Sequence, residues 1–315
     1  MNFLSLFDGM SFGQIALNRI GITNYTYYAS EIDKYAIQVT QSNYPNTIQL
    51  GDITNIKASN LPKIDLIIGG SPCQGFSFAG KQLNFNDPRS KLFFEYVRLA
   101  KECNPKYFLL ENVLMKKEYQ DVISKYLGVE PIFINSSLVS AQNRKRLYWT
   151  NIPNITLPED AKINLVDIIE DGCVDRHKSH CLDANYYKGG NLKAYFEKHR
   201  RQLIFTDESL LAGQIVGRRL KNGVRADSDK SIPIIQQIEV NELPHKTNCL
   251  TTVQKDNIVI KVDKGYRNLL PVECKRLQTV PDNYTAHVSN SQRYKMLGNG
   301  WTVDVIAHIL KVIND

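Results

Sequence analysis

Residues 3–11 read Phe-Leu-Ser-Leu-Phe-Asp-Gly-Met-Ser, and the fold is decided by this stretch. The first five residues form a compact apolar run typical of a buried strand, and Gly9 lies in the turn that follows. The pattern over residues 12–20 predicts a helix that ends at Gly21. A strand, a glycine-containing turn and a helix in this order are typical of a nucleotide-binding unit. An ordinary tight turn between a strand and a helix is the alternative.

Outward from this unit, short β-rich runs alternate with helical patterns. Six further runs read as strands, at residues 25–30, 48–50, 64–68, 107–110, 131–134 and 147–150. Helical patterns cover residues 33–44, 91–102, 271–277 and 301–313. This alternation favours an α/β fold with a doubly wound, mostly parallel, seven-stranded Rossmann-like sheet. In such a sheet the ligand site lies beyond the carboxyl ends of the strands.

Residues capable of chemistry follow five of the predicted strands, namely Gly9, Glu31, Asp52, Cys73 and Glu111. Glu31 lies about 20 residues beyond the glycine turn, which suits a carboxylate that accepts hydrogen bonds from ribose hydroxyls. Asp52 suits an acceptor for an adenine amino group. Either acid alone is more readily a surface residue. Together, and without a phosphate-binding P-loop, they favour a phosphate-free adenosine ligand over ATP.

A cysteine ends the fourth predicted strand, in the segment Gly69-Gly70-Ser71-Pro72-Cys73. Two glycines and a proline force an abrupt turn, which would present Cys73 at the sheet edge as a nucleophile. A half-buried structural cysteine is the alternative. The six cysteines include no CxxC pair and no cluster of zinc spacing, so we expect neither a disulfide framework nor a metal site.

Two polar segments adjoin later strands. Glu111 lies among apolar residues and should be partly desolvated, so that it can donate or share a proton; a strand-end acid that caps a helix is the alternative. Gln142, Arg144 and Arg146 lie in a basic segment before the seventh strand. This segment is either a phosphate-contacting loop or a solvated basic turn.

Composition and charge define the broad class. The chain is 43% hydrophobic and 23% charged, as globular proteins are, and it has no apolar run long enough to span a membrane. Of a net charge of +7, residues 172–230 contribute 12 Lys and Arg against 7 Asp and Glu. Such a stretch is either a solvated face or a surface that contacts phosphates. We expect a cytoplasmic protein with no membrane partner.

The segments above, taken in order, resemble the motifs of the DNA cytosine-5 methyltransferase family. The resemblance covers residues 1–151 and 265–312. It rests on the glycine turn, Glu31, Asp52, Pro72-Cys73-Gln74, Glu111-Asn112-Val113, Gln142-x-Arg144-x-Arg146, Arg276-Leu277-Gln278 and Gly298-Asn299-Gly300. Ser11 replaces a usual glycine, Ser71 stands where phenylalanine is frequent, and Trp301 is similar to the closing motif of the animal de novo enzymes.

The resemblance implies methyl transfer from S-adenosylmethionine to carbon 5 of a flipped-out cytosine in a specific duplex DNA sequence, with S-adenosylhomocysteine as product and no metal. The implied catalytic residues are Cys73, Glu111 and Arg144. The implied cofactor-binding residues are Phe7, Gly9, Glu31, Ile32, Asp52, Ile53, Pro72, Leu92, Asn299 and Trp301. The implied DNA-binding residues are Gln74, Ser77, Arg89, Gln142, Arg146, Arg218, Arg219 and Arg225.

The family also implies a division into domains. We expect a catalytic domain of residues 1–155 plus 285–315 and a small, loop-rich target-recognition domain of residues 156–284, because the chain becomes polar and dotted with Gly, Asn and Asp after residue 155. The expected partner is double-stranded DNA, bound by a monomer of prokaryotic or phage origin. The enzyme acts either as an orphan or beside a cognate restriction endonuclease.

Three other functions compete with this hypothesis. A tRNA cytosine-5 methyltransferase would carry a late Cys-Phe-Thr segment, which is absent from this sequence. A catalytically silent DNA-binding protein on the same fold would be expected to lack Cys73 or Glu111. An enzyme that methylates an exocyclic amine would have an Asp/Ser-Pro-Pro-aromatic segment, and residues 71–74 break that pattern.

Overall fold

The computed structural model describes residues 1–72, 91–205, 210–221, 224–240, 258–261 and 265–313. The chain divides into two compact units. Unit 1 comprises residues 1–168, 178–202 and 270–315, and unit 2 comprises residues 169–177 and 203–269. The chain therefore passes between the units four times, so neither unit is one continuous segment.

A seven-stranded sheet forms the centre of unit 1, with the order β3-β2-β1-β4-β5-β7-β6. The strands are β1 (Asn2–Leu6), β2 (Thr26–Ser30), β3 (Ile48–Gln49), β4 (Leu66–Gly70), β5 (Tyr107–Val113), β6 (Ile132–Asn135) and β7 (Lys145–Thr150). The first five strands in this order, β3, β2, β1, β4 and β5, pair in parallel with their neighbours. β7 pairs antiparallel with both β5 and β6. The predicted doubly wound, mostly parallel sheet is confirmed.

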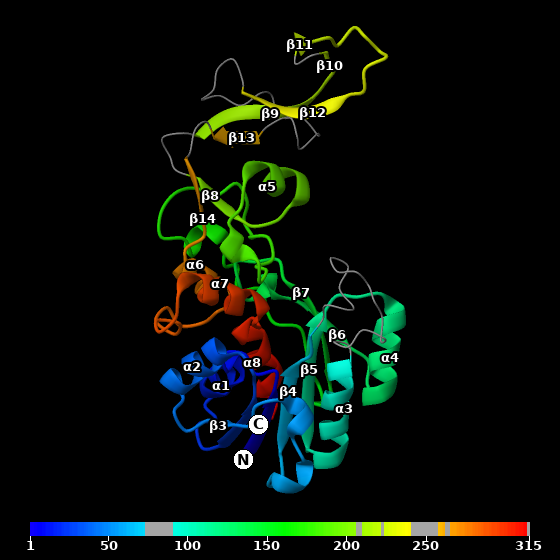
Figure 1. Cartoon of the computed structure of the whole chain (residues 1–315), viewed down its shortest axis with the longest axis vertical. Helices are drawn as coiled ribbons and strands as arrows, with labels where there is room; N and C mark the ends of the chain where they lie inside the picture. Colours follow the sequence, from blue (N-terminus) through cyan, green and yellow to red (C-terminus); the bar gives the residue numbers. More distant parts are fainter. Residues whose placement is uncertain (73–90, 206–209, 222–223, 241–257, 262–264, 314–315) are drawn as a thin grey trace. The chain divides into compact units, whose positions relative to one another are not determined.

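Helices cover both faces of this sheet. Figure 1 shows α1 (Phe12–Arg19), α2 (Lys34–Asn43) and α8 (Val303–Lys311) on one side, and α3 (Lys91–Cys103) and α4 (Lys117–Leu127) on the other. Because both faces are covered, residues 66–69 of β4 are all buried, as their apolar sequence predicts. Trp149 is also fully buried, and its Nε1 donates to Ser124 Oγ on α4 at 3.0 Å.

Local sequence explains where several helices begin and end. The Asp33 side chain caps α2 by accepting from Tyr35 N at 3.0 Å. At the end of α4, Gly128 adopts a left-handed conformation with φ 74°. The pattern predicted helices at residues 271–277 and 301–313, which correspond to α6 (Pro271–Leu277) and α8. It missed α7 (Asn290–Asn299), because that helix is rich in polar residues.

The sheet order places the site. The chain winds outward to one side from β1 and to the other side from β4, so the switch point lies between these two neighbours. At a switch point the loops after the strands diverge and leave a crevice. The turn over residues 7–11 follows β1, and Ser71 and Pro72 follow β4. The glycine turn and the segment leading to Cys73 therefore begin at adjacent strand ends.

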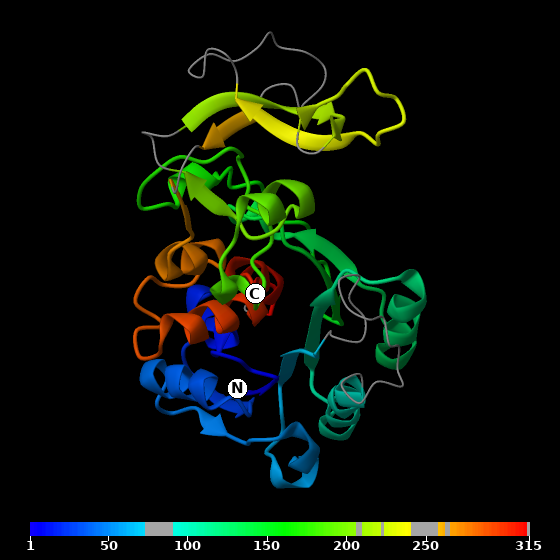
Figure 2. The same ribbon diagram turned by 45° about the horizontal axis from the view of Figure 1, so that its top comes forward.

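Unit 2 is built of short antiparallel strands, seen in green, yellow and orange in Figure 2. The strands are β8 (Leu203–Phe205), β9 (Leu210–Arg218), β10 (Leu220–Lys221), β11 (Val224–Arg225), β12 (Ile235–Val240), β13 (Ile258–Lys261) and β14 (Tyr266–Asn268). They form a three-stranded sheet of order β12-β9-β13 and two two-stranded pairs. The expected second domain, residues 156–284, includes segments 156–168, 178–202 and 270–284 that belong to unit 1. The short helix α5 (Leu192–Lys198) lies in the second of these.

No helix in the described part of the chain combines the length and apolar character that crossing a membrane requires.

Candidate active site

The turn after β1 alternates between ordinary and left-handed backbone. Phe7, Gly9 and Ser11 have φ values of 59°, 59° and 56°. Only Gly9 adopts this conformation without a steric cost. The backbone N of Gly9 donates to Glu31 Oε2 at 2.8 Å, so the turn and the end of β2 hold each other in place.

Two acids stand at the ends of β2 and β3, as the sequence predicted. Glu31 Oε1 accepts from Ile32 N at 2.7 Å and from Asp33 N at 2.8 Å, so three backbone N–H groups orient this carboxylate. Asp52 Oδ1 accepts from the backbone and the hydroxyl of Thr54, and these hydrogen bonds hold the pKa of Asp52 below its usual value. Both acids present an oriented acceptor at the edge of the sheet.

The two neighbouring apolar residues differ in exposure. The Ile32 side chain is 75% exposed beside Glu31, whereas Ile53 is buried with 4% exposure. An exposed isoleucine next to an oriented carboxylate can contact a flat apolar ligand. Ile53 instead belongs to the hydrophobic core.

The end of β4 meets a tryptophan from the last part of the chain. A Cβ placed on Gly70 would lie 2.9 Å from Trp301 Nε1 and 3.1 Å from Glu111 Oε2. Glycine at position 70 therefore allows the indole and the carboxylate to approach β4 closely. Asn112, next to Glu111, donates from Nδ2 to Ser71 Oγ at 3.1 Å. This bond ties the end of β5 to the segment that leads to Cys73.

A buried ion pair forms at the centre of the site. Arg146 Nε on β7 lies 2.8 Å from Glu111 Oε1 on β5, and the exposed fractions of the two side chains are 13% and 11%. The β5–β7 register brings them together, because Arg146 lies opposite Val113, two residues beyond Glu111. The pair can present a carboxyl group and a guanidinium group together to a planar ring.

Arg144, the expected catalytic arginine, has a different place. Its guanidinium is 2% exposed and donates to the backbone carbonyls of Leu182, Gly298 and Gly300 at 3.0, 3.3 and 2.7 Å. Burial, and after it the nearby charge of Arg146, lowers the pKa of Arg144. In this structure the Arg144 guanidinium therefore joins three segments of unit 1.

Gln142, expected to contact DNA, is also fully buried. Its Nε2 donates to Leu277 O at 2.6 Å and to Gln278 Oε1 at 2.9 Å. Gln278 in turn donates to Leu297 O at 2.6 Å. The motif over residues 142–146 thus supplies two structural side chains, Gln142 and Arg144, and one that reaches the site, Arg146.

Several predicted residues cannot be placed in the site. Cys73, Gln74, Ser77 and Arg89 lie outside the described residues. Pro72 and Leu92 are described and partly buried on either side of that segment, and Asn299 is exposed at the end of α7.

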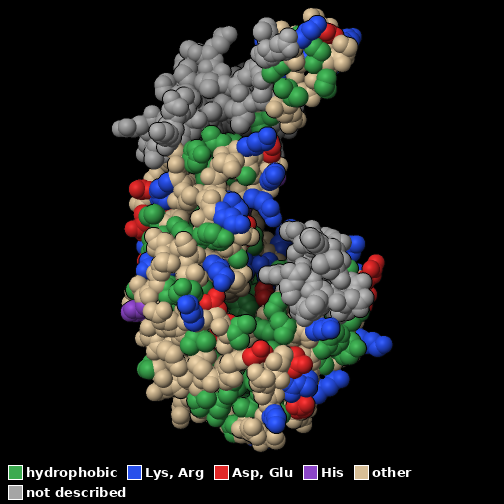
Figure 3. All heavy atoms as spheres, in the orientation of Figure 1, with side chains coloured by type: hydrophobic (Ala, Val, Ile, Leu, Met, Phe, Trp, Pro, Cys, Tyr) green, Lys and Arg blue, Asp and Glu red, His purple; other side chains and the backbone are tan. Residues whose placement is uncertain are grey.

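In unit 2, three predicted arginines converge on one acid. Asp227 Oδ2 lies 2.5 Å from Arg225 Nε and 3.7 Å from Arg218 Nη1, and Asp227 Oδ1 accepts from Arg219 N at 3.0 Å. This contact links β9 to the β10–β11 hairpin. In Figure 3, Lys and Arg side chains group in the middle of the presented face.

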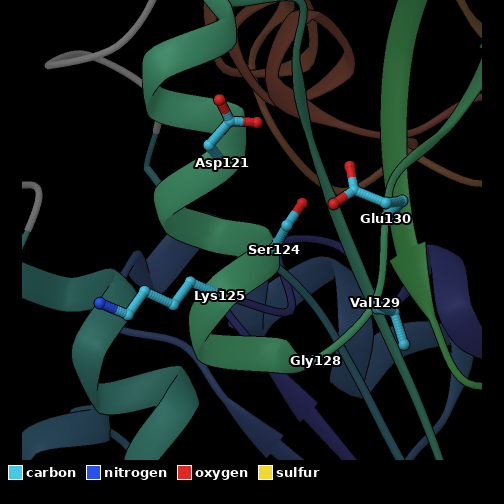
Figure 4. A pocket seen from close by; sticks show the side chains of 6 residues that line it. All are labelled: Asp121, Ser124, Lys125, Gly128, Val129 and Glu130. Carbon is cyan, nitrogen blue, oxygen red and sulfur yellow. The ribbon is translucent and has the colours of Figure 1, made fainter.

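Two surface depressions lie away from these residues. One, of about 300 Å³, is lined by Asp121, Ser124, Lys125, Gly128, Val129 and Glu130 (Figure 4). Asp121, Ser124 and Lys125 all come from α4, and Lys125 points away from Asp121. The other, of about 560 Å³, is lined by Lys57, Ala58, Ser59, Arg98 and Glu102. None of the predicted site residues lines either depression.

Two contributions to the site escaped sequence reasoning. Asp8 is buried inside the glycine turn, and an acid between apolar residues was the available signal. Lys178 donates from Nζ to the carbonyls of Ser137, Ser140 and Ile163 at 2.7, 3.1 and 2.7 Å, and so braces the chain before Gln142. One basic residue in a basic stretch carried no signal for that role.

The chain matches known sequences over its whole length. A family described as C-5 cytosine-specific DNA methylase matches residues 1–315. The type II methyltransferase M1.ScrFI of Lactococcus lactis subsp. cremoris is 31% identical over 295 residues, which cover 89% of this chain and 69% of that protein. The type II methyltransferase M.FnuDI of Fusobacterium nucleatum is 30% identical over 347 residues, which cover 100% and 94% of the two chains.

Solved structures share the fold. The Entamoeba histolytica methyltransferase EhMeth superimposes with a TM-score of 0.67 at 17% sequence identity, over 100% of this chain and 98% of that one. At this identity the similarity concerns the fold alone.

Proposed function

The chain belongs to the C-5 cytosine-specific DNA methylase family, and from that premise we propose how its residues divide the work of methyl transfer. The enzyme is a DNA cytosine-5 methyltransferase that uses S-adenosylmethionine. The observation that carries the proposal is the Glu111–Arg146 pair, which lies at the ends of β5 and β7 beside Gly70.

The cofactor suits the residues that follow the strands of the sheet. Glu31, oriented by three backbone N–H groups, would accept from the ribose hydroxyls, and Asp52 would accept from the adenine amino group. The exposed Ile32 side chain offers an apolar surface to the adenine ring. S-adenosylmethionine, when bound, supplies an electrophilic methyl group.

Cys73 is the proposed nucleophile. Carbon 5 of cytosine is a poor nucleophile, so addition of the Cys73 thiolate to carbon 6 must come first; it forms a carbon–sulfur bond and makes carbon 5 electron-rich. Carbon 5 then takes the methyl group. Loss of its proton to water re-forms the ring double bond and expels the thiolate. Asn112 assists by tying Ser71 to β5, two residues before the nucleophile.

Glu111 and Arg146 are proposed to hold the ring while this occurs. Glu111 would accept from the amino group and share a proton with ring N3, which stabilises the charge that develops on addition. Arg146, held by the same carboxylate, would donate to the ring carbonyl. This proposal gives Arg146 the catalytic role that the family resemblance implied for Arg144, because the Arg144 guanidinium is already bonded to backbone carbonyls.

The remaining assignments concern the substrate and its setting. A stacked base cannot be attacked at carbon 6, so the cytosine must leave the helix at a cost of a few kcal/mol. We place target recognition on unit 2, with Arg218, Arg219 and Arg225 as candidates for phosphate or guanine contacts. We further propose a monomer that acts in the cytoplasm without a metal. A cognate endonuclease is suggested by the type II relatives.

Methyl transfer from labelled S-adenosylmethionine to duplex DNA tests the proposal. Cys73→Ala should abolish transfer, whereas Cys103→Ala, which alters a cysteine at the end of α3, should retain it. Near-normal activity of Cys73→Ala would exclude the covalent route.

Two further experiments test the role of Glu111 and the choice of nucleic-acid substrate. Glu111→Gln should lose rate far more than DNA affinity, and an equal loss in both would indicate a structural role. Duplex DNA and tRNA, assayed side by side, should give product on DNA only; transfer to tRNA alone would favour the competing function.

A further inference from the structure

Asp8 lies inside the turn that follows β1 and does not belong to the reaction described above. Its side chain is buried, with 6% exposure, and both oxygens accept hydrogen bonds. Asp8 Oδ2 accepts from the Ser11 hydroxyl, and Asp8 Oδ1 accepts from the Tyr27 hydroxyl at 2.9 Å. The carboxylate of Glu31 also interacts with it electrostatically. A buried carboxylate held by hydroxyl groups costs free energy.

Ser11 is the residue that this carboxylate holds. Ser11 is fully buried and has left-handed backbone angles, φ 56° and ψ 43°, at the N-cap of α1. A serine at an N-cap ordinarily bonds to the first turn of its helix, but this one makes no such bond. Its hydroxyl points back to Asp8 and also accepts from Thr40 Oγ1 at 3.3 Å. The Asp8 carboxylate thus compensates for a non-glycine residue in a conformation that favours glycine.

The neighbouring residues are arranged around this contact. Gly13 on α1 has no side chain, and a Cβ there would lie 2.5 Å from the Tyr27 hydroxyl. The absence of that Cβ lets Tyr27 reach Asp8. Gly9, between Asp8 and Ser11, donates its N–H to Glu31, the acid proposed to bind the ribose. A change in the backbone at Ser11 would therefore be transmitted to Glu31 through one residue.

We propose that Asp8 is a positioning residue for cofactor binding, which acts by anchoring the Ser11 hydroxyl so that the turn keeps its left-handed form without a glycine. The inference rests on the proposed function, since it concerns the site assigned to S-adenosylmethionine. It predicts that Asp8 is needed because Ser11 is there, and that a glycine at position 11 makes Asp8 largely dispensable.

Isothermal titration with S-adenosylhomocysteine, combined with thermal unfolding, tests this dependence in a double-mutant cycle. Asp8→Ala should weaken binding at least tenfold. Ser11→Gly alone should stay within about threefold of the wild type, and the double variant Asp8→Ala/Ser11→Gly should recover most of the loss. Tyr27→Phe, which removes the other bond to Asp8, is the matched control: it should lower the unfolding temperature but keep the affinity within about threefold.

The outcomes separate the possibilities. Unchanged affinity in Asp8→Ala, or no recovery in the double variant, would overturn the inference; the second result would indicate direct contact with the cofactor or a purely structural role. If Asp8→Ala does not fold, Asp8→Asn and the double variant Asp8→Asn/Ser11→Gly take its place. The same recovery of S-adenosylhomocysteine affinity in the double variant is then expected. Failure of the wild-type chain to bind S-adenosylhomocysteine would instead overturn the proposed function.

Discussion

The two arginines of the segment over residues 142–146 differ in what surrounds them. Arg144 donates to the backbone of Leu182 and to that of Gly298 and Gly300, which are two segments far apart in the chain, while Arg146 bonds a carboxylate. A buried guanidinium with several carbonyl acceptors stabilises the fold, because each charge-assisted bond contributes about 1.5–3 kcal/mol. A guanidinium beside a carboxylate at a strand end is placed for a ligand.

Alanine substitutions should separate these roles. Arg146→Ala should lower kcat about 100-fold, a loss typical of one well-placed donor, and change the unfolding temperature little. Arg144→Ala should leave three carbonyls without donors and lower the unfolding temperature by roughly 5–10 °C. Steady-state kinetics and thermal unfolding of both variants measure this. The assignment fails if Arg146→Ala keeps full activity while Arg144→Ala loses activity without loss of stability.

Asp8 should also make the stability of the enzyme depend on pH. Burial raises the pKa of Asp8 from 3.8 to about 6. Because the unfolded chain loses this proton first, the stability that the protonated form contributes is complete below pH 4 and is lost as pH rises to about 6. The loss amounts to about 3 kcal/mol.

Asp8→Asn removes this dependence. Between pH 4 and 6, the unfolding free energy of the wild type should therefore fall relative to that of Asp8→Asn. Above pH 6 the difference between the two should stay constant. Urea unfolding at several pH values measures it. Asp229→Asn is the control, since hydrogen bonds from Ser231 lower the pKa of Asp229 and no loss with rising pH is expected. A pH-independent difference for Asp8→Asn would contradict the argument.

At the scale of elements, the ends of β4 and β5 meet a segment from the far end of the chain. Gly69 and Gly70 close β4, but they face different neighbours. A Cβ on Gly69 would lie 2.9 Å from the backbone oxygen of Leu6, inside the sheet, whereas one on Gly70 would meet Trp301 and Glu111. The absence of a side chain at Gly69 lets β4 lie close to the Leu6 backbone. Its absence at Gly70 lets Trp301 and Glu111 approach the end of β4.

Gly70→Ala and Gly69→Ala form a matched pair that tests this difference. Gly70→Ala should displace the Trp301 indole and Glu111, and lower kcat/KM at least tenfold at a modest cost in stability. Gly69→Ala should destabilise the sheet, because the clash is with backbone, and lower the unfolding temperature more than Gly70→Ala does. Kinetics and thermal unfolding decide; a reversal of the two effects would show that Trp301 and Glu111 tolerate the added carbon.

At the scale of the whole molecule, the chain crosses between its two units four times. Residues 178–202 belong to unit 1 although unit 2 contains the residues on both sides of them. Within unit 1 this segment supplies Lys178 and the Leu182 carbonyl, which hold the segment that carries Arg146. The proposed recognition unit is thus joined directly in sequence to residues that support the segment of Arg146.

The salt dependence of DNA binding tests the role of unit 2. Arg225 is 64% exposed beside Asp227, and if it contacts a phosphate, Arg225→Ala should weaken DNA binding and reduce the slope of log Kd against log salt by about 1. Lys117→Ala, which alters a 68% exposed lysine on α4, should leave the slope unchanged. Affinity for S-adenosylhomocysteine should be normal in both variants. An unchanged slope in Arg225→Ala would exclude a phosphate contact.

The sequence alone determined the seven strands of the central sheet, its doubly wound arrangement, and the positions of Glu31 and Asp52 after strand ends. Each of these follows from local apolar runs, turn residues and short motifs, which are contiguous in the chain. It also predicted the family. The helix α7 was missed because its composition is polar, so local pattern alone could not reveal it.

Only the tertiary structure decided which side chains face the chemistry. The spacing of Gln142, Arg144 and Arg146 does not distinguish them, and the β5–β7 register alone brings Arg146 to Glu111. The placement of Trp301 against Gly70, and the anchoring of Ser11 by Asp8, likewise depend on contacts that local pattern does not encode. The sequence thus determined the family to which this protein belongs, and the packing of distant segments decided which of its motif residues lie together.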